Sequence, residues 1–524
     1  MLYDVIIIGG GAAGCAAAHP LVAAGHNVLM IDAGSGYIHS ANKTRPSLTE
    51  LRTQKGYSSE HLLGHNLSSL RNVGFSSQKI RTATSPSFED GYHEVNRLKT
   101  NNFMAIGTLN LGGLTNIWGG TVCTYDDNDM ETWPISADEM ADSYKNIISR
   151  IGVSGGEFGT IDDAKHLTQP TIPARGSCAK LYERYQNHPI QNFSIERPML
   201  AVLSEDKGNR GSCIECKGCM WGCHTGAVYN AAVEVLSLKK HFNFTLMTLT
   251  KVQAIRKNGS NYTIETINTS GNSNSIYSAP RIIVAAGTIP TTRLILDFQN
   301  RVEHTVPLAT SPAFGFAMLM PKRLGHTIEK QGFGLAQLSY KHALSNDVND
   351  YSYGLIYEGD SFSLADLATV MPITNRSALG LLRIILPSLM IGLGYLPSKY
   401  VSNTAKLSKS GHLTIEGQNS DQYSDAMKIA SESIKRSFNK LGVWVLPRSL
   451  RPFEPGADAH YAGTLPMGKE LTRNGELNNY PGIFIADGAA LPSLPAKNPT
   501  LTIMANADRI ATHIAQEISK VNSL

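Results

Sequence analysis

The 524-residue sequence lacks the features that mark several specialised classes of protein. It has no block of basic residues and a net charge of only +4, so nothing in it indicates a nucleic-acid partner. It has no internal repeat and no low-complexity linker. Charged residues make up 17% and hydrophobic residues 42%, a balance typical of globular enzymes. Because a chain of this length exceeds what one core usually organises, we expect two or more lobes.

The sequence also offers little that would cross a membrane. Met1 and Leu2 lead directly into a predicted strand, which leaves no room for a signal peptide, and we therefore expect a cytoplasmic protein. The one long apolar run, 378–397, is interrupted by Arg383 and Pro387. We expect this run to be buried or to line a substrate channel. The alternative is peripheral contact with a membrane surface.

Cysteine is scarce, but four of the seven cysteines fall within eleven residues. Cys213, Cys216, Cys219 and Cys223 follow a C-x2-C-x2-C-x3-C spacing that lets their thiolates converge on one centre. Such runs commonly hold iron–sulfur clusters. Because no second run exists, we predict one cluster, 3Fe-4S or 4Fe-4S. A structural zinc site is the main alternative, and disulfides are disfavoured in a reducing compartment.

The chain opens with a fingerprint for dinucleotide binding. In order, it reads as a strand over 3–8, the glycines Gly9, Gly11 and Gly14, a helix over 15–24, a strand over 27–31, and Asp32. The first glycine allows the tight turn, the second lets a pyrophosphate approach, and the third allows the helix to pack closely on the strand. Asp32 can accept hydrogen bonds from an adenosine ribose.

Further elements follow from local patterns. We predict a strand over 244–255, a strand over 281–287 with a helix starting at 291, a helix from the capping box at Ser136 to about 151, a helix over 425–441 ended by Gly442, and a last helix over 499–518. In the last helix, Asn498 suits the N-cap and Pro499 the first helical position.

Four longer motifs carry a resemblance to a known family. They are a glycine-rich segment over 111–120, H-x-x-G-T-x-x-M-G over 460–468, a segment over 485–492 and Asn-Pro-Thr-Leu-Thr over 498–502. Together they resemble motifs of the glucose–methanol–choline (GMC) oxidoreductases. The cysteine run before Tyr229 and Asn230 resembles the iron–sulfur-containing bacterial sugar dehydrogenase branch of that family.

The resemblance implies an α/β fold with a Rossmann-like FAD-binding lobe of dispersed segments. It also implies a substrate lobe on a mixed or antiparallel β-sheet backed by helices. We expect the FAD lobe to comprise 1–155, 231–300 and 451–524, the last with the catalytic motifs, the substrate lobe 156–210 and 301–450, and the cysteine insertion 211–230.

The resemblance also implies site residues. The predicted FAD contacts are Gly9, Gly11, Ala13, Gly14, Asp32, Gly112, Gly113, Thr115, Asn116, Val252, Ala286, Asp487, Gly488, Pro499 and Thr500. The FAD is expected to be non-covalent, because Ile117 stands where related enzymes have a linking histidine. Thr291, Thr292 and Arg293 depart from the usual Ser-Pro at their position.

The same motifs suit alcohol oxidation. His460 can take the hydroxyl proton as a general base, flavin N5 can accept the hydride, and Asn498 can orient the substrate oxygen. We expect an alcohol substrate, that of a sugar or sugar derivative, with electrons leaving singly through the cluster to an acceptor protein or quinone. The alternatives are an electron-transfer flavoprotein that oxidises no alcohol and a non-enzymatic flavoprotein module with structural zinc.

Overall fold

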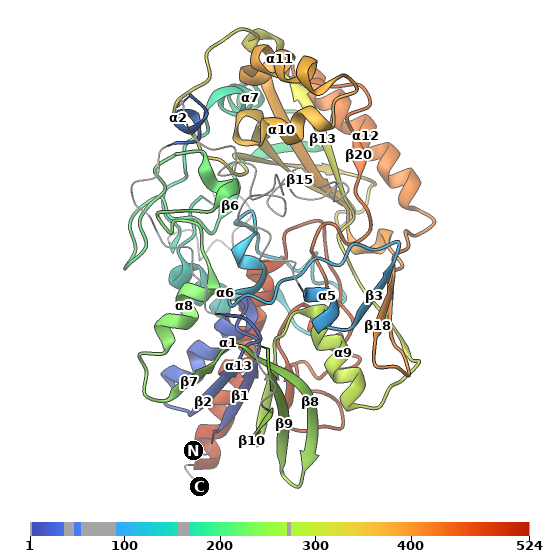
Figure 1. Cartoon of the computed structure of the whole chain (residues 1–524). Helices are drawn as coiled ribbons and strands as arrows, with labels where there is room; N and C mark the ends of the chain where they lie inside the picture. The colour runs from blue at the N-terminus through green and yellow to red at the C-terminus, as the bar shows by residue number, and fades with distance from the viewer. Residues whose placement is uncertain (1–2, 36–46, 54–90, 156–166, 270–273, 523–524) are drawn as a thin grey trace.

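A computed structural model describes residues 3–35, 47–53, 91–155, 167–269 and 274–522. Figure 1 shows two lobes, one above the other, with both chain termini at the lower end of the lower lobe. The lower lobe is built from segments of the N-terminal, middle and C-terminal parts of the chain. The boundaries predicted between lobes stay predictions, and the one at 155/156 adjoins residues outside the described ranges.

A five-stranded parallel sheet forms the centre of the lower lobe. Its strand order is β21-β11-β1-β2-β7, with bounds Ile483–Ile485, Arg281–Val284, Val5–Ile8, Val28–Ile31 and Phe244–Met247. Its strands are almost wholly apolar, because a parallel sheet is covered on both faces. The helices of this lobe are α1 (Ala12–Ala23), α6 (Ala137–Ile151), α8 (Ala231–Leu238), α9 (Thr288–Phe298) and α13 (Thr500–Asn522). The Rossmann-like lobe is thus confirmed.

The predicted single strand over 244–255 is two strands in different sheets. β7 ends at Met247, and β8 (Thr250–Asn258) begins a three-stranded antiparallel sheet with β9 (Asn261–Asn268) and β10 (Asn274–Ala279). Leu249, between them, has a left-handed φ of 53°. That conformation redirects the backbone, which a pattern of alternating side chains does not reveal.

An antiparallel sheet of seven strands forms the upper lobe. The strands are β5 (Phe193–Glu196), β14 (Leu338–Ala343), β15 (Tyr351–Glu358), β16 (Leu389–Tyr395), β13 (Ala313–Leu319), β19 (Trp444–Val445) and β20 (Arg451–Pro452). Residues of α7 (Gly176–Asn187) and α12 (Tyr423–Lys440) share its hydrophobic core. This arrangement confirms the predicted substrate sheet backed by helices. A smaller sheet joins β12 (Thr305–Pro307), β17 (Thr404–Leu407), β18 (Leu413–Glu416) and β3 (Leu98–Asn101).

Two helix ends follow their sequence signals closely. Ser136 and Glu139 form the predicted capping box at the start of α6. Helix α12 ends at Lys440, two residues before Gly442, which has the left-handed φ of 68° that glycine readily adopts. The local patterns therefore predicted both helices to within two residues at each end.

The apolar run 378–397 divides between two environments. Its first part belongs to the exposed helix α11 (Asn375–Ile385), and its second part is β16, a buried strand of the substrate sheet. The expected burial therefore holds for β16 and is wrong for the outer face of α11. No helix within the described residues is long and apolar enough to cross a membrane.

Candidate functional site

A cavity of about 260 Å³ opens where the glycine turn after β1 meets the start of α13. Twelve of the fifteen predicted FAD contacts line it: Gly9, Gly11, Ala13, Asp32, Gly113, Thr115, Val252, Ala286, Asp487, Gly488, Pro499 and Thr500. They come from segments far apart in the sequence. The structure therefore brings the separate motifs to one place, although their contact with a cofactor stays a prediction.

The other three predicted contacts, Gly14, Gly112 and Asn116, do not line the cavity but support the segments that do. A Cβ at Gly14 would lie 1.9 Å from the Gly9 carbonyl oxygen, so only glycine lets α1 pack this closely on β1. Gly112 adopts a left-handed φ of 91°. Asn116 donates from Nδ2 to the carbonyl oxygens of Leu111 at 3.0 Å and Gly113 at 2.8 Å. These residues hold the glycine-rich loop in its bend.

The glycine turn suits a pyrophosphate. Gly11 is the N-cap of α1, has no side-chain cap, and lines the cavity. The uncapped amides and the positive end of the helix dipole therefore face the space that an anion would occupy. Asp32 accepts hydrogen bonds from the Gly10 amide at 2.6 Å and the Gly34 amide at 2.8 Å. Burial is the main cause that raises the pKa of this carboxyl.

Two cations on the cavity wall escaped the sequence analysis. Lys251 on β8 and Arg293 on α9 both line the cavity. Burial, then the charges of Arg293 and Arg97, lower the pKa of Lys251 to about 8. An anionic ligand would relieve this repulsion. The sequence did hold signals for both cations. Lys251 precedes Val252, a predicted FAD contact, and Arg293 belongs to the Thr-Thr-Arg segment that replaces the usual Ser-Pro.

The Thr-Thr-Arg segment over 291–293, which replaces the usual Ser-Pro, has a structural role. Thr291 Oγ1 donates to Asp487 Oδ2 at 2.5 Å, and the Gly287 amide donates to the same oxygen at 2.9 Å. The other oxygen, Oδ1, accepts from the Ala489 amide at 3.0 Å. These bonds tie the segment over 485–492 to the start of α9. Burial raises the pKa of Asp487 to about 6.

The predicted catalytic residues lie side by side. Asn498 Nδ2 is 3.4 Å from His460 Nε2, and the ring of Tyr395, at the end of β16, is 5.0 Å from the imidazole centroid to centroid. His460 lines the cavity. Burial lowers its pKa to about 4, so the imidazole is neutral near pH 7. This is the protonation state that a general base needs.

One polar atom of each residue in this pair lacks a hydrogen-bond partner within the described structure. His460 Nδ1 and Asn498 Oδ1 are buried and have no hydrogen-bond partner among the described residues. The N-cap role predicted for Asn498 is therefore wrong, because its Oδ1 accepts no bond from the first turn of α13. Such unsatisfied atoms are costly in a folded protein and occur where a ligand or catalysis uses them.

The four cysteines of the run line a second, smaller cavity, together with His224. The run is folded back on itself by left-handed residues at Glu215 (φ 54°) and Lys217 (φ 60°). The Val228 amide donates to Cys223 Sγ at 3.4 Å. Burial, with smaller contributions from the neighbouring Cys223 and Cys216, raises the pKa of Cys213 to about 12. The four cysteines therefore surround one small cavity, and their role as metal ligands stays a prediction.

The spacing of the sulfurs bears on what they could hold. No three thiols of the run lie within 4.8 Å of one another in the described structure. Tetrahedral zinc, with Zn–S bonds of about 2.3 Å, would hold its sulfurs about 3.8 Å apart. A cluster of several irons is larger than one ion and holds its thiolates further apart. The four thiols are therefore not arranged as a closed tetrahedral zinc site in the described structure, and the cavity between them measures only about 10 Å³.

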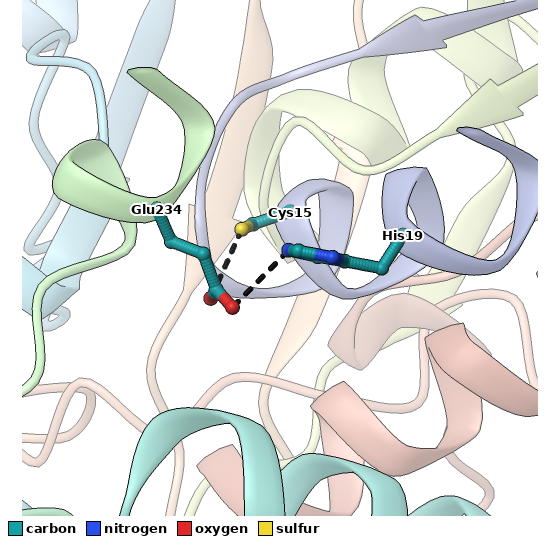
Figure 2. A group of neighbouring side chains, drawn as sticks. All are labelled: Cys15, His19 and Glu234. Carbon is teal, nitrogen blue, oxygen red and sulfur yellow. Dashed lines mark hydrogen bonds and ion pairs between the residues drawn. The ribbon is translucent and has the colours of Figure 1, made fainter. Parts of the chain in front are cut away.

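A different trio does meet the distance criterion for a single ion. Figure 2 shows Cys15 and His19 of α1 pointing toward Glu234 of α8. The Arg150 guanidinium, however, donates to the same carboxylate at 2.6 Å. Burial raises the pKa of the Cys15 thiol, which donates to Glu234 at 3.3 Å. This group is a buried ion-pair network that joins α1, α6 and α8, because arginine already supplies its cation.

A buried ion pair anchors the cysteine run to the substrate lobe. Lys217 Nζ lies 2.5 Å from Asp360 Oδ2, and both side chains are at least nine-tenths buried. Lys217 also donates to the carbonyl oxygen of Glu329 at 2.6 Å. The run therefore cannot shift without breaking a pair that has no access to solvent.

Comparisons with known proteins agree with these observations. Residues 414–507 match the family model GMC oxidoreductase, and residues 3–104 match pyridine nucleotide-disulphide oxidoreductase. The chain is 24% identical to paromamine 6'-oxidase of Streptomyces fradiae, covering 99% of this chain and 92% of that protein. A shorter match, 38% identical, covers 16% of this chain and 18% of C-glycoside 3-oxidase of Arthrobacter globiformis.

The fold comparison gives the same result. The crystal structure of pyridoxine 4-oxidase from Mesorbium loti superposes with a TM-score of 0.64 at 13% identity, covering 98% of this chain and 99% of that one. None of these similarities singles out an iron–sulfur branch, so that part of the sequence interpretation stays a prediction. They set aside the two alternatives without alcohol oxidation. The chain is similar to the GMC oxidoreductases, whose family model matches residues 414–507, and it is an FAD-dependent enzyme that acts on the CH–OH group of its donors.

Proposed function

We propose that this enzyme oxidises a hydroxyl group of a sugar or sugar derivative to a carbonyl, with His460 as the general base and Asn498 as the orienting residue. The observation that carries the proposal is the contact between these two side chains, each with a buried and unsatisfied polar atom. One member of the pair, His460, lines the cavity proposed for the cofactor.

The residues that would hold FAD are the glycine turn, α1 and the start of α13. When bound, FAD supplies the acceptor for the hydride that leaves the alcohol carbon. Ile117 occupies the position of a linking histidine, so we propose that FAD is non-covalent. Acid precipitation should release all the flavin, and flavin that stays with the denatured chain would refute this part.

The chain's own residues handle the proton. At neutral pH the imidazole of His460 is uncharged, so it can accept the hydroxyl proton as the hydride departs. The Asn498 amide can donate a hydrogen bond to the substrate oxygen and fix its orientation. Tyr395 covers the imidazole with its ring and so limits the access of water from the substrate sheet.

The substrate class is proposed from the relatives. Their names specify an aminoglycoside constituent and C-glycosides as substrates, and both are built from sugar rings. We therefore propose an amino sugar or glycoside as the donor. Anaerobic reduction of the bound flavin by a panel of aminoglycosides, glycosides and simple alcohols tests this. Reduction by simple alcohols alone would contradict the proposed class.

We further propose that Cys213, Cys216, Cys219 and Cys223 hold an iron–sulfur cluster that exports electrons singly to an acceptor protein or quinone. The position of all four cysteines around one cavity supports it, together with their spacing in the sequence. The named relatives are oxidases, which favours direct reaction with dioxygen as the second candidate for the acceptor.

A short physical link between the two cavities supports export through the cysteines. Trp118 lines the large cavity, and its Nε1 donates to the Tyr229 carbonyl oxygen at 2.8 Å. The two rings also meet edge to face, with centroids 6.1 Å apart. The preceding residue, Val228, donates its amide to Cys223 Sγ. The Trp118 side chain and the backbone of two consecutive residues, Val228 and Tyr229, therefore connect the flavin cavity to a thiol of the run.

The deciding experiment is elemental analysis with a visible spectrum after anaerobic purification. We expect iron and acid-labile sulfide. The Cys219→Ser variant should still allow substrate to reduce the flavin in one turnover but should fail in steady state with a one-electron acceptor. Cys178→Ser, in α7 and outside the run, serves as the control and should turn over normally. Zinc without iron, or normal turnover by Cys219→Ser with that acceptor, would refute export through the run.

A further inference from the structure

Helix α11 and the turn that joins it to α10 (Leu364–Thr369) carry a concentrated set of exposed apolar side chains. Among the described residues, fifteen large hydrophobic side chains are exposed, and five of them fall within 370–384. These five define the α10–α11 patch: Val370, Ile373, Leu379, Leu381 and Ile384, with exposed fractions between 39% and 59%. Scattered exposed apolar residues are ordinary, but a contiguous group marks an interaction surface.

The patch is not a frayed segment that has lost its core. The inner face of α11 is anchored by Ala378 and Leu382, which are fully or almost fully buried. Thr374 caps the helix by accepting a hydrogen bond from the Ser377 amide. The helix is therefore held in place, and its exposed apolar side chains flank the two arginines of its outer face. Figure 1 shows α11 at the top of the upper lobe, at the opposite end from the chain termini.

Most of the exposed charges around the patch are positive, and Glu329, which pairs with Arg323 at 3.7 Å, is the exposed acidic residue described beside it. Arg376 and Arg383 are exposed on α11, and neither forms an ion pair in the described part of the chain. No aspartate or glutamate occurs anywhere between 367 and 415. The neighbouring turn η6 (Pro321–Arg323) adds exposed Lys322, followed by exposed Leu324. Apolar side chains beside unpaired cations are the composition of helices that lie in the interface of anionic membranes.

We propose that the α10–α11 patch docks the enzyme on the surface of an anionic lipid bilayer. The apolar side chains would enter the headgroup region, and the two arginines would meet the lipid phosphates. A bilayer fits better than a second copy of the chain, because two copies would bring the same arginines together. Docking is peripheral, since α11 has only eleven residues and cannot span a bilayer.

The patch is close in the sequence to the residue that anchors the cysteine run. Asp360, which pairs with Lys217 of the cysteine run, lies four residues before α10 begins at Leu364. If the proposed export through the cysteines is correct, a docked enzyme would present that side to a lipid-soluble quinone. The docking itself does not depend on the cluster, so the two proposals can fail separately.

Flotation with vesicles tests the proposal on the full chain. The holoenzyme should float with vesicles of phosphatidylcholine and phosphatidylglycerol, and much less with phosphatidylcholine alone or in high salt. The Arg376→Gln/Arg383→Gln variant should bind about 30-fold more weakly, since each arginine near such a surface contributes a factor of roughly five. Leu381→Gln/Ile384→Gln should also lose binding. Flavin content and melting temperature serve as folding controls.

Phe242→Gln is the matched control, because Phe242 is 98% exposed but stands outside the patch. It should float as the wild type does. Equal flotation by the patch variants and the wild type would overturn the proposal, as would failure of the wild type to bind anionic vesicles. A dimer that becomes a monomer on Leu381→Gln/Ile384→Gln substitution would instead assign the patch to contact between copies.

Discussion

Asn498 presents its side-chain amide to the imidazole of His460, with 3.4 Å between Nδ2 and Nε2, although 38 residues separate them in the chain. Asn498 lies just before the last helix, and His460 lies on the segment that leads from β20 of the substrate sheet to β21 of the parallel sheet. Because His460 Nδ1 and Asn498 Oδ1 are left without partners in the described structure, the pair is incomplete without a ligand. The predictions below begin from this pair.

Removing the amide should slow the chemical step more than it weakens the fold. We expect Asn498→Ala to lower the rate of flavin reduction by about 100-fold, the usual effect of losing one oriented donor. Because Asn498 caps no helix, the melting temperature should hold. Stopped-flow absorbance checks the rate. A variant as fast as the wild type would show that Asn498 does not contact the reacting oxygen.

The pH profile should reflect the depressed pKa of His460. Burial lowers that pKa to about 4, so the imidazole loses its proton as the pH rises through 4 and remains a base above it. We expect kcat/KM to rise with pH up to about 4 and not to titrate with His460 between pH 5 and 8. An inflection at His460's ordinary pKa near 6.5 would contradict this environment.

Asp458 is the acidic group most able to complicate that profile. It lies two residues from His460, and burial raises its pKa to about 7. Any inflection near pH 7 should therefore disappear in Asp458→Asn. An inflection that survives in this variant would have to come from another group.

Substitution of Gly11 and of Gly14 should have different effects, one on FAD binding and the other on stability. A Cβ at Gly11 would have only Gly113 Cα nearby, at 3.9 Å, whereas a Cβ at Gly14 would lie 1.9 Å from the Gly9 carbonyl oxygen. Gly11→Ala should keep its melting temperature and bind FAD more weakly. Gly14→Ala should lose about 1–3 kcal/mol of stability through overpacking. Thermal unfolding and flavin release distinguish the two, and the reverse pattern would contradict the assigned roles.

Removing one partner of the buried Lys217–Asp360 ion pair should lower the stability of the protein. Lys217→Met leaves Asp360 buried without its cation, and we expect a loss of about 3–5 kcal/mol in the free energy of unfolding. Replacing both residues, as in Lys217→Met/Asp360→Leu, should recover much of that loss. Chemical denaturation measures both variants. A double variant no more stable than Lys217→Met would show that the pair does not act as a unit.

The sequence predicted well what is encoded locally. The strand, three glycines, helix, strand and Asp32 appear in the structure in that order, because each step rests on neighbouring residues. The capping box at Ser136 and the glycine after α12 followed for the same reason. The site as a whole was predicted from motifs of a family, since nothing local indicates that residues 460 and 498 meet.

What the sequence could not show depends on the path of the chain. The turn at Leu249 splits an apparently continuous strand, and the run 378–397 changes from exposed helix to buried strand at Pro387. Tyr395, Trp118 and Lys251 reach the site only because distant strands and loops are brought together. Their residue types are common, so the only signals were the positions of Lys251 beside Val252 and of Trp118 within the segment over 111–120.

The most direct test of the account is the rate at which an active sugar substrate reduces the bound flavin without oxygen, compared between the wild type and His460→Gln. Both should hold FAD, because the glycine turn and α13 remain intact. We predict a loss of about two orders of magnitude or more in the variant, as expected for a missing general base. A variant that reduces its flavin within a few-fold of the wild type would contradict the central claim.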